Sequence, residues 1–236
     1  MTPVPSALSI RKAADRGRTR TGWLDSAHTF SFGGYRDPAH MGFRALRVLN
    51  EDRVAPGGGF GPHSHAEMEI LTYVVEGALA HRDSTGTEGV IRAGDVQRMT
   101  AGSGIVHSER NASDTDPVRF LQIWLLPARE GLAPGYAQRG TGEAGAGLVR
   151  LADRAGRDGA LCVHADAALS LARLDAGERL ALPLDAGRHG WLQLVRGALR
   201  ADGTGLEAGD GAAVSDAEAL LVEAREPSLL LWFELG

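Results

Sequence analysis

Two short groups of residues that commonly bind metals stand out in the sequence, His63-Ser-His65 and His107-Ser-Glu109. Alternate residues of a β-strand point to the same face, so each group can direct two side chains at one point. Two such strands brought together would present three histidines and one carboxylate. That donor set suits a first-row divalent metal with open positions for water, oxygen or substrate.

Glycine residues punctuate the sequence around both groups. The β-rich run that ends at Glu76-Gly77 predicts a strand that enters a tight hairpin, and Gly94-Asp95 predicts the next turn, because glycine adopts the positive φ that a turn can require. This layout resembles the two motifs of cupin barrels. It departs from them in that Thr100 stands where the second motif usually has proline, and His107 comes two residues late.

The first half of the chain carries a more specific resemblance. The segment Gly22-Trp-Leu-Asp-Ser-Ala-His-Thr-Phe-Ser-Phe32 resembles the N-terminal signature of the pirin family, one branch of the cupin superfamily. Further segments resemble pirins in the same order, whereas the second half is matched by length, spacing and a few anchors such as Asp158–His164. The further matching segments are Asp37–Phe43, Leu46–Gly58, Met68–Gly77, His81–Ser84 and Met99–Glu109.

A weak internal repeat predicts two similar domains. Tyr73–Ala80 resembles Gln193–Arg200, and Arg92–Asp95 resembles Glu207–Asp210, so a strand, a glycine turn, a strand and a Gly-Asp turn recur in the same order. We therefore expect an all-β fold of two antiparallel cupin (jelly-roll) barrels in one chain, a bicupin. The expected boundaries are an N-terminal metal-binding domain at 1–130, a linker rich in glycine, proline and alanine at 131–147, and a C-terminal domain at 148–236.

The pirin resemblance implies which residues hold the metal. Carried over by position, the ligands are His63, His65, His107 and Glu109. We expect one divalent transition metal per chain, Fe(II) first, with Cu, Ni, Co, Mn or Zn as alternatives, because N and O ligands follow a general affinity order and do not select one ion. Glu109 is also the expected catalytic residue, since a carboxylate beside an open site can take a proton from a substrate hydroxyl. Glu69, at a position that some cupins use for a glutamate ligand, is the alternative carboxylate.

The second half of the chain lacks an equivalent donor set. Leu182–His189, which corresponds to the first group, contains a single histidine, and Gly209–Glu218, which corresponds to the second, contains none. We therefore expect the C-terminal domain to be structural and free of metal. The remaining histidines that we expect in turns, loops or hydrogen bonds are His28, His40, His81, His164 and His189.

Composition narrows the class of protein. Of the 236 residues, 43% are hydrophobic, which is ample for a core, and the formal net charge of −5 argues against broad electrostatic attachment to DNA. The single Cys162 excludes an internal disulfide, and no apolar run approaches the length of a membrane-spanning helix or follows a basic start as in a signal peptide. We expect a cytoplasmic monomer with no direct nucleic-acid or membrane contact.

The resemblance also implies an activity. Relatives in the pirin family include proteins with quercetin 2,3-dioxygenase activity, in which O2 opens the central ring of a flavonol and carbon monoxide is released. The expected substrate is therefore a small flavonol-like aromatic molecule. The alternative is an iron-dependent redox-sensing regulator that binds a transcription factor or an enzyme, and the same four ligands would serve it. A sugar or small-acid isomerase is supported by the fold alone. The aromatic residues that are candidates to line a pocket mouth are Phe30, Phe32, Tyr35 and Phe43.

Overall fold

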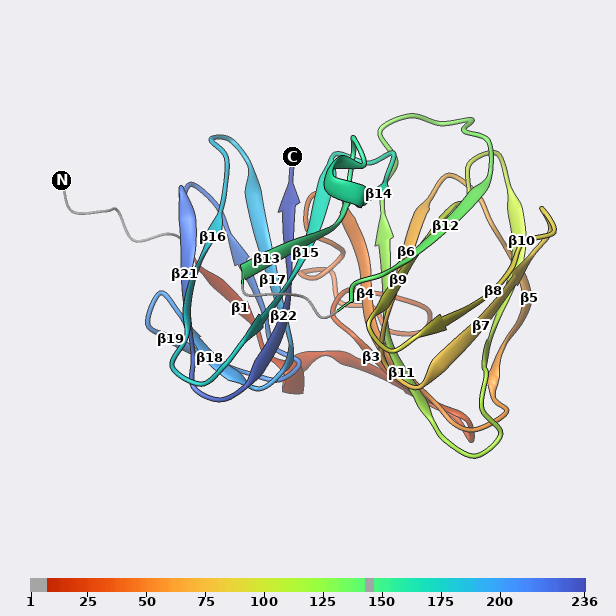
Figure 1. The fold of residues 1–236 in the computed structure, drawn as a ribbon, viewed down its shortest axis with the longest axis horizontal. Coiled ribbons are helices and arrows are strands. Elements are labelled where there is room, and N and C mark those ends of the chain that lie inside the picture. The colour runs from red at the N-terminus through yellow and green to blue at the C-terminus, as the bar shows by residue number, and fades with distance from the viewer. Residues whose placement is uncertain (1–7, 143–146) are drawn as a thin grey trace. The chain divides into compact units, whose positions relative to one another are not determined.

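The chain folds into two compact units built almost entirely from antiparallel strands (Figure 1). The computed structural model describes residues 8–142 and 147–236. With 59% strand and 3% helix, it confirms the all-β expectation. The N-terminal unit comprises Gly17–Gly142 and Arg154–Asp166, and the C-terminal unit comprises 8–16, 147–153 and Ala167–Gly236.

Eleven of the strands in the N-terminal unit form two sheets that face each other (Figure 1). These strands are β2 (Gly17–Arg20), β3 (Leu24–His28), β4 (Leu46–Val54), β5 (Gly59–His65), β6 (Glu69–Glu76), β7 (Ala78–Asp83), β8 (Glu88–Arg92), β9 (Asp95–Thr100), β10 (Ile105–Asn111), β11 (Val118–Leu125) and β12 (Gly135–Gly140). The larger sheet has the order β12-β9-β6-β11-β4-β3-β2, and the smaller sheet has the order β5-β10-β7-β8. The unit also contains a short 3-10 helix, η2 (Arg157–Gly159), and β14 (Leu161–Cys162).

The interior of the N-terminal unit is layered along its strands. On β6, alternate inward residues are Val74, Thr72 and Ile70, so a polar position lies between two apolar ones. Val74 belongs to one buried apolar cluster, with Phe120, and Ile70 belongs to another, with residues such as Met99. The polar positions between these clusters form a layer of their own. The candidate site described below lies in this polar layer.

The C-terminal unit repeats the same arrangement of two sheets. Its elements are β1 (Ser9–Arg11), η1 (Ala13–Asp15), β13 (Gly147–Asp153), β15 (Ala167–Leu174), β16 (Arg179–Pro183), β17 (His189–Arg196), β18 (Ala198–Ala201), β19 (Thr204–Glu207), β20 (Gly211–Val214), β21 (Ala219–Ala224) and β22 (Ser228–Leu235). One sheet contains the order β1-β20-β17-β22-β15-β13, and the other has the order β16-β21-β18-β19. Its interior is apolar, with Leu182, Leu194, Val222 and Trp232 fully or almost fully buried in one cluster.

The predicted repeat is confirmed by two glycine turns at equivalent places. Gly77 joins β6 to β7 with φ +76°, and Gly197 joins β17 to β18 with φ +85°. A Cβ at Gly77 would lie 2.8 Å from the carbonyl oxygen of Pro117, and one at Gly197 would lie 2.5 Å from that of Pro227. Both the left-handed backbone and the lack of space therefore require glycine at these turns.

The segment expected to be a linker contains a strand. Within 131–147, β12 pairs antiparallel with β9, Tyr136 opposite Met99. At the N-terminus, β1 pairs with β20 and so belongs to the C-terminal unit. Residues 1–7 of the expected first domain and 143–146 of the expected linker lie outside the described residues. In the described part of the chain, no helix has both the length and the apolar character to span a membrane.

Candidate metal centre

Strand pairing places the two ligand groups side by side. In the antiparallel ladder of β5 and β10, His107 lies directly opposite His63, and Ile105 lies opposite His65. Along β10, His107 and Glu109 are buried while the flanking residue Arg110 is exposed, as the two-residue period of a strand requires. The first and third residues of each group therefore point to the interior of the unit. These residues are His63 and His65 in one group and His107 and Glu109 in the other.

Three of the four predicted ligands converge closely. The ring centroids are 4.8 Å apart for His63 and His65, 4.5 Å for His63 and His107, and 4.9 Å for His65 and His107. The Nε2 atoms of His63 and His107 are 3.1 Å apart. One ring nitrogen from each of the three histidines lies within 4.8 Å of the others. The structure thus brings these three side chains to one point.

The pKa values of His65 and His107 fit a metal site. Burial, together with the neighbouring His63, lowers the pKa of His65 to about 4 and that of His107 to about 3. Neutral imidazoles have a free lone pair, which a metal requires. The Nδ1 atom of His63 lies 2.8 Å from the carbonyl oxygen of Gly61, to which it can donate its proton, and this leaves its Nε2 lone pair facing His107. The donor set of this site therefore fits a divalent transition metal.

Glu109 contacts three polar side chains. Its Oε1 accepts a hydrogen bond from Gln97 Nε2 at 3.0 Å and lies 3.4 Å from Thr72 Oγ1, and its Oε2 accepts a hydrogen bond from Gln122 Nε2 at 2.9 Å. Burial, and to a lesser extent the nearby Asp52, raise the pKa of the carboxyl to about 7 against the lowering effect of these polar neighbours. The carboxylate therefore sits in a preformed cradle that fixes its orientation.

Glu109 groups with a fifth residue that the sequence did not indicate as a ligand. His81, His107 and Glu109 form a second cluster in which one donor atom from each lies within 4.8 Å of the others, and all three residues are buried. His107 belongs to both clusters, whereas His63 and His65 belong only to the first. The structure thus places the four predicted ligands in two overlapping groups.

A row of polar side chains supports Glu109 from the larger sheet. Gln97, Thr72, Gln122, Asn50 and His28 occupy directly paired positions on five neighbouring strands, β9, β6, β11, β4 and β3. Gln97 Nε2 donates to Thr72 Oγ1 at 2.9 Å, and Thr72 Oγ1 donates to Gln122 Oε1 at 2.6 Å. At the other end, His28 Nδ1 lies 2.9 Å from Asn50 Oδ1. The sequence did not indicate this polar row, although Thr72 and Gln122 are single polar residues within apolar runs of β6 and β11.

A cavity of about 420 Å³ opens beside the histidines. Phe32, Phe60 and Trp124 contribute aromatic surface to it, and of the four aromatic candidates from the sequence only Phe32 is among its lining residues in the described chain. The polar lining includes Asp52, a buried residue whose Oδ1 accepts a short hydrogen bond from Ser26 Oγ. Burial raises the pKa of Asp52 to about 7. The polar side chains that line the cavity are Thr19, Ser26, His28, Asn50, Asp52, His63, His65, Glu109 and Gln122.

Several other histidines make hydrogen bonds, as expected. His40 Nδ1 lies 2.7 Å from Asp37 Oδ2, and His189 Nδ1 lies 2.7 Å from Ser215 Oγ. The alternative carboxylate, Glu69, is fully buried and accepts a hydrogen bond from the backbone N–H of His164 at 3.1 Å. In the described parts of the chain Glu69 lies in neither metal-ligand cluster.

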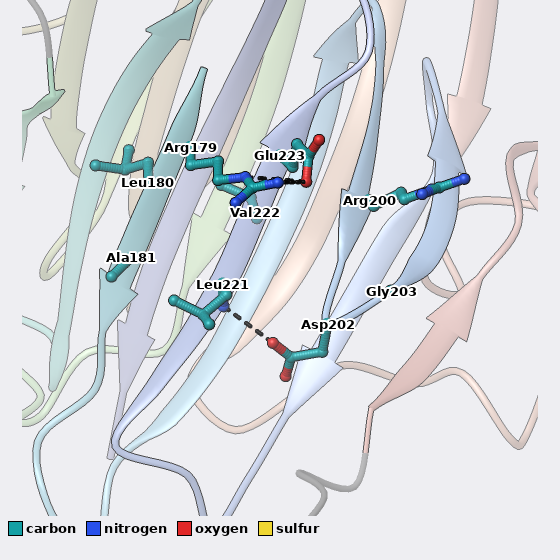
Figure 2. Close-up of a pocket in the computed structure, with 9 residues that line it drawn as sticks. All are labelled: Arg179, Leu180, Ala181, Arg200, Asp202, Gly203, Leu221, Val222 and Glu223. Atoms are coloured by element: carbon teal, nitrogen blue, oxygen red, sulfur yellow. Dashed lines mark hydrogen bonds and ion pairs between the residues drawn. The ribbon is translucent and has the colours of Figure 1, made fainter. Parts of the chain in front are cut away.

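The corresponding sheet of the C-terminal unit carries different side chains. Figure 2 shows a pocket formed by β16, β18, β21 and the turn that follows β18. Its volume is about 470 Å³. Arg179 and Glu223, paired on neighbouring strands, form an ion pair at 3.0 Å, and the exposed Leu221 donates its backbone N–H to Asp202 Oδ1 at 3.1 Å. Both candidate metal clusters found in residues 8–142 and 147–236 lie in the N-terminal unit.

Comparison with known proteins identifies the family. The Pirin family model matches residues 10–125, and the model for the quercetinase C-terminal cupin domain matches 151–235. A solved structure of the bacterial pirin YhhW from Escherichia coli, a complex with nickel(II), is 42% identical to this chain. The match covers 97% of this chain and 98% of that one, with a TM-score of 0.93. The chain belongs to the pirin family.

Similar sequences carry an enzyme name. This pirin is 43% identical over 228 residues to a quercetin 2,3-dioxygenase of Escherichia coli strain K12, a match that covers 97% of this chain and 98% of the relative. It is 42% identical to a putative quercetin 2,3-dioxygenase of Pseudomonas aeruginosa, with 96% and 99% covered. These matches span both units, so the bicupin expectation is confirmed along with the family.

Proposed function

We propose that this pirin is a metal-dependent dioxygenase that opens the central ring of quercetin-like flavonols with O2. The observation that carries the proposal is the convergence of His63, His65 and His107 beside a cavity of about 420 Å³ that Glu109 also lines. Relatives that are 43% identical over nearly the whole chain are named quercetin 2,3-dioxygenase. The site and the relatives therefore support the same chemistry.

The proposed ligands are His63, His65, His107 and Glu109. A divalent metal is supported by the histidine cluster and by the nickel(II) complex of the related pirin, and Fe(II) is our first proposal for the ion. When bound, such a metal supplies a Lewis-acid centre with a positive charge and open positions for substrate oxygen. Three neutral histidines and one carboxylate would leave the centre with net positive charge, which favours an anionic flavonol oxygen.

Glu109 is the proposed acceptor of the substrate's hydroxyl proton. The side-chain amides of Gln97 and Gln122 donate to its two oxygens, so the carboxylate keeps one orientation while substrate enters. A general base must lie within hydrogen-bond reach of the proton that it removes, and Glu109 meets this requirement only for a substrate seated deep in the cavity.

The cavity wall suits a polyphenol. Phe32, Phe60 and Trp124 offer faces and edges against which aromatic rings can pack. The hydrogen-bonding groups of His28 and Asn50 on the facing strands can meet phenolic hydroxyls. A pocket with mostly apolar walls and a few placed polar groups is the usual form of a small-molecule site.

The proposal is tested by reconstitution. Metal-free protein loaded separately with Fe, Mn, Co, Ni or Cu should consume O2 with quercetin while the flavonol absorbance falls, and at least one metal should give turnover far above that of the metal-free protein. Free transition metals oxidise flavonols by themselves, so His63→Ala at the same metal concentration is the negative control, and His40→Ala is the matched positive control. If no metal-loaded sample is faster than the metal-free protein, the dioxygenase proposal is wrong and the regulator hypothesis takes its place.

A further inference from the structure

Behind His107, on the side away from His63, lies a second buried histidine. His81 on β7 is opposite Glu109 in the ladder with β10, and the next inward residue of β7, Asp83, is opposite His107. The ring of His81 lies 5.4 Å from that of His107 between centroids. The His81 ring also stacks on Tyr136, with the two ring centroids 4.6 Å apart, and this contact restricts the plane of the ring.

The hydrogen bonds of His81 define its tautomer. Its Nε2 lies 3.0 Å from Asp83 Oδ2, and both side chains are completely buried. The other oxygen, Asp83 Oδ1, accepts hydrogen bonds from Thr85 N at 2.9 Å, Thr85 Oγ1 at 2.6 Å and Thr87 N at 3.3 Å. Asp83 can only accept toward His81, so in the neutral ring His81 Nε2 carries the proton and Nδ1 has the lone pair.

His107 has the complementary arrangement. Its Nε2 faces His63 Nε2 at 3.1 Å, within the group of three histidines, so in the neutral ring a metal-binding Nε2 leaves the proton on Nδ1. Within the described residues, the Nδ1 atoms of both His107 and His81 are buried and have no hydrogen-bond partner. A buried donor and a buried acceptor, each unsatisfied, therefore lie on adjacent rings.

We propose that His81 is a positioning residue for the metal centre: His107 Nδ1–H donates to His81 Nδ1 when the centre is loaded, and Asp83 holds His81 in the accepting tautomer. This inference rests on the metal ligands of the proposed function. Histidine ligands generally donate their second ring N–H to a carboxylate, carbonyl or water, which fixes the ring and makes it a stronger ligand. Here an imidazole takes that place, and its lone pair is directed by a buried carboxylate.

The substitution Asp83→Asn tests the tautomer directly. The three donors from Thr85 and Thr87 require an oxygen at their side, so the new NH2 group would face His81 Nε2. His81 would then accept at Nε2 and carry its proton on Nδ1, where it would oppose the proton of His107. The side chain has the same shape, so the fold is retained while the dissociation constant for Zn(II), measured by competition with a chelator, should rise about 10- to 100-fold.

Asp95→Asn is the matched control. Asp95 is a half-buried aspartate at the start of β9 whose Oδ2 accepts from the backbone N–H of Arg92 at 3.0 Å, and it lies in neither metal-ligand cluster of the described chain. Its substitution should leave Zn(II) affinity within about twofold of the wild-type value. His81→Phe, which keeps a ring against Tyr136 but removes the acceptor, should weaken binding as Asp83→Asn does.

Nitrogen-15 NMR of Zn(II)-loaded protein with labelled histidines reports the protonation of each ring nitrogen. A residue with a purely structural role would show no specific hydrogen bond to His107 in this measurement. We expect a slowly exchanging proton on His107 Nδ1 and a scalar coupling across the N–H···N bond to an unprotonated His81 Nδ1. In Asp83→Asn the coupling should be lost and His81 Nδ1 should become protonated. A protonated His81 Nδ1 in the wild type, or unchanged Zn(II) affinity in Asp83→Asn, would overturn the proposal.

Failure of the positioning proposal can be distinguished from failure of the dioxygenase proposal. Two bound Zn(II) ions per chain with His81 as a direct ligand would contradict the positioning role and point to a second metal site at His81, His107 and Glu109. If the scalar coupling between His107 and His81 is observed but no metal gives flavonol turnover, His81 keeps its positioning role and the dioxygenase proposal is wrong. A protein that binds neither Zn(II) nor any of the metals used for reconstitution would overturn both.

Discussion

His107 is the residue at which the contacts of the site meet. It lies opposite His63 in the ladder, belongs to both metal-ligand clusters, and contacts the ring of His81 on its buried side. Its burial and its histidine neighbours keep the imidazole neutral at physiological pH by lowering its pKa to about 3. Loss of this one side chain should therefore affect metal binding more than the fold.

We predict that His107→Ala strips the metal and leaves the protein folded. The apolar clusters on either side of the polar layer do not include His107, so the circular dichroism spectrum should be unchanged. Metal content after reconstitution, measured by elemental analysis, should fall at least about tenfold. His189→Ala, which removes a histidine of the C-terminal unit, is the control and should keep full content. Full occupancy in His107→Ala would rule out the proposed ligands.

Asp52 gives a prediction about pH. Burial raises its pKa from 3.8 to about 7, so the folded protein retains a proton that the unfolded chain releases at lower pH. The stability associated with the neutral carboxyl is fully present below about pH 4 and is lost as the pH rises through about 7. Asp52→Asn, which cannot ionise but can still accept from Ser26, should escape this loss.

The measurement is urea unfolding of metal-free wild type and Asp52→Asn at about pH 5 and about pH 8. The variant should gain stability relative to wild type between these two pH values, on the order of a few kcal/mol. A difference between the two proteins that is the same at both pH values would show that Asp52 ionises in the folded state as easily as in the unfolded chain.

At the scale of single elements, the hairpin turns determine how the inward faces meet. The turn at Gly77 carries the chain from β6, which supplies Thr72 to the polar row, to β7, which supplies His81. Because a strand alternates its faces with every residue, a change of register at this turn would move the polar positions out of their layer. The turn therefore bears on the site although it lies outside it.

Gly77→Ala should destabilise the protein much more than Gly86→Ala. Both residues have positive φ, +76° and +90°, so the conformational strain is similar. A Cβ at Gly77 would lie 2.8 Å from Pro117 O and 3.1 Å from Val118 Cα, whereas a Cβ at Gly86 has open space around it. We expect a loss of about 1 kcal/mol for Gly86→Ala and roughly 2–4 kcal/mol for Gly77→Ala in urea unfolding. Equal losses would mean that the backbone moves aside at Gly77 at little cost.

At the scale of the whole molecule, the two units have the same arrangement of sheets but different interiors. In the N-terminal unit a polar layer separates two apolar clusters, and in the C-terminal unit the inward residues of β17 and β22, such as Leu194 and Trp232, continue as one apolar cluster. The metal chemistry therefore depends on side chains that the first unit has and the second lacks, and not on the fold itself.

The parts of this organisation that the sequence predicts are local or repeated. The two-residue period of a strand was enough to place both members of His63-Ser-His65 on one face, and the structure shows Ser64 exposed between two half-buried histidines. The repeat at Gly77 and Gly197 was enough to predict two barrels. The first feature needs only the residues of one strand, and the second needs only the comparison of two hairpins along the sequence.

The parts that the sequence did not reveal depend on pairing between distant segments. Gln97, Thr72 and Gln122 each look like an isolated polar residue until the sheet places them side by side around Glu109. Likewise His81 is one histidine among eight until β7 pairs with β10. The strand β12 was missed because its order comes from pairing with β9 and not from its own composition.

The release of carbon monoxide from quercetin tests the central claim most directly. Ring opening of the flavonol by a dioxygenase adds both atoms of O2 and expels one carbon of the central ring as CO, so O2, quercetin and CO change in equimolar amounts. Metal-loaded wild-type protein should produce CO in step with the loss of quercetin absorbance, and His107→Ala at the same metal concentration should not. Quercetin consumed without CO, or CO formed equally fast by His107→Ala, would contradict a dioxygenase site at His63, His65, His107 and Glu109.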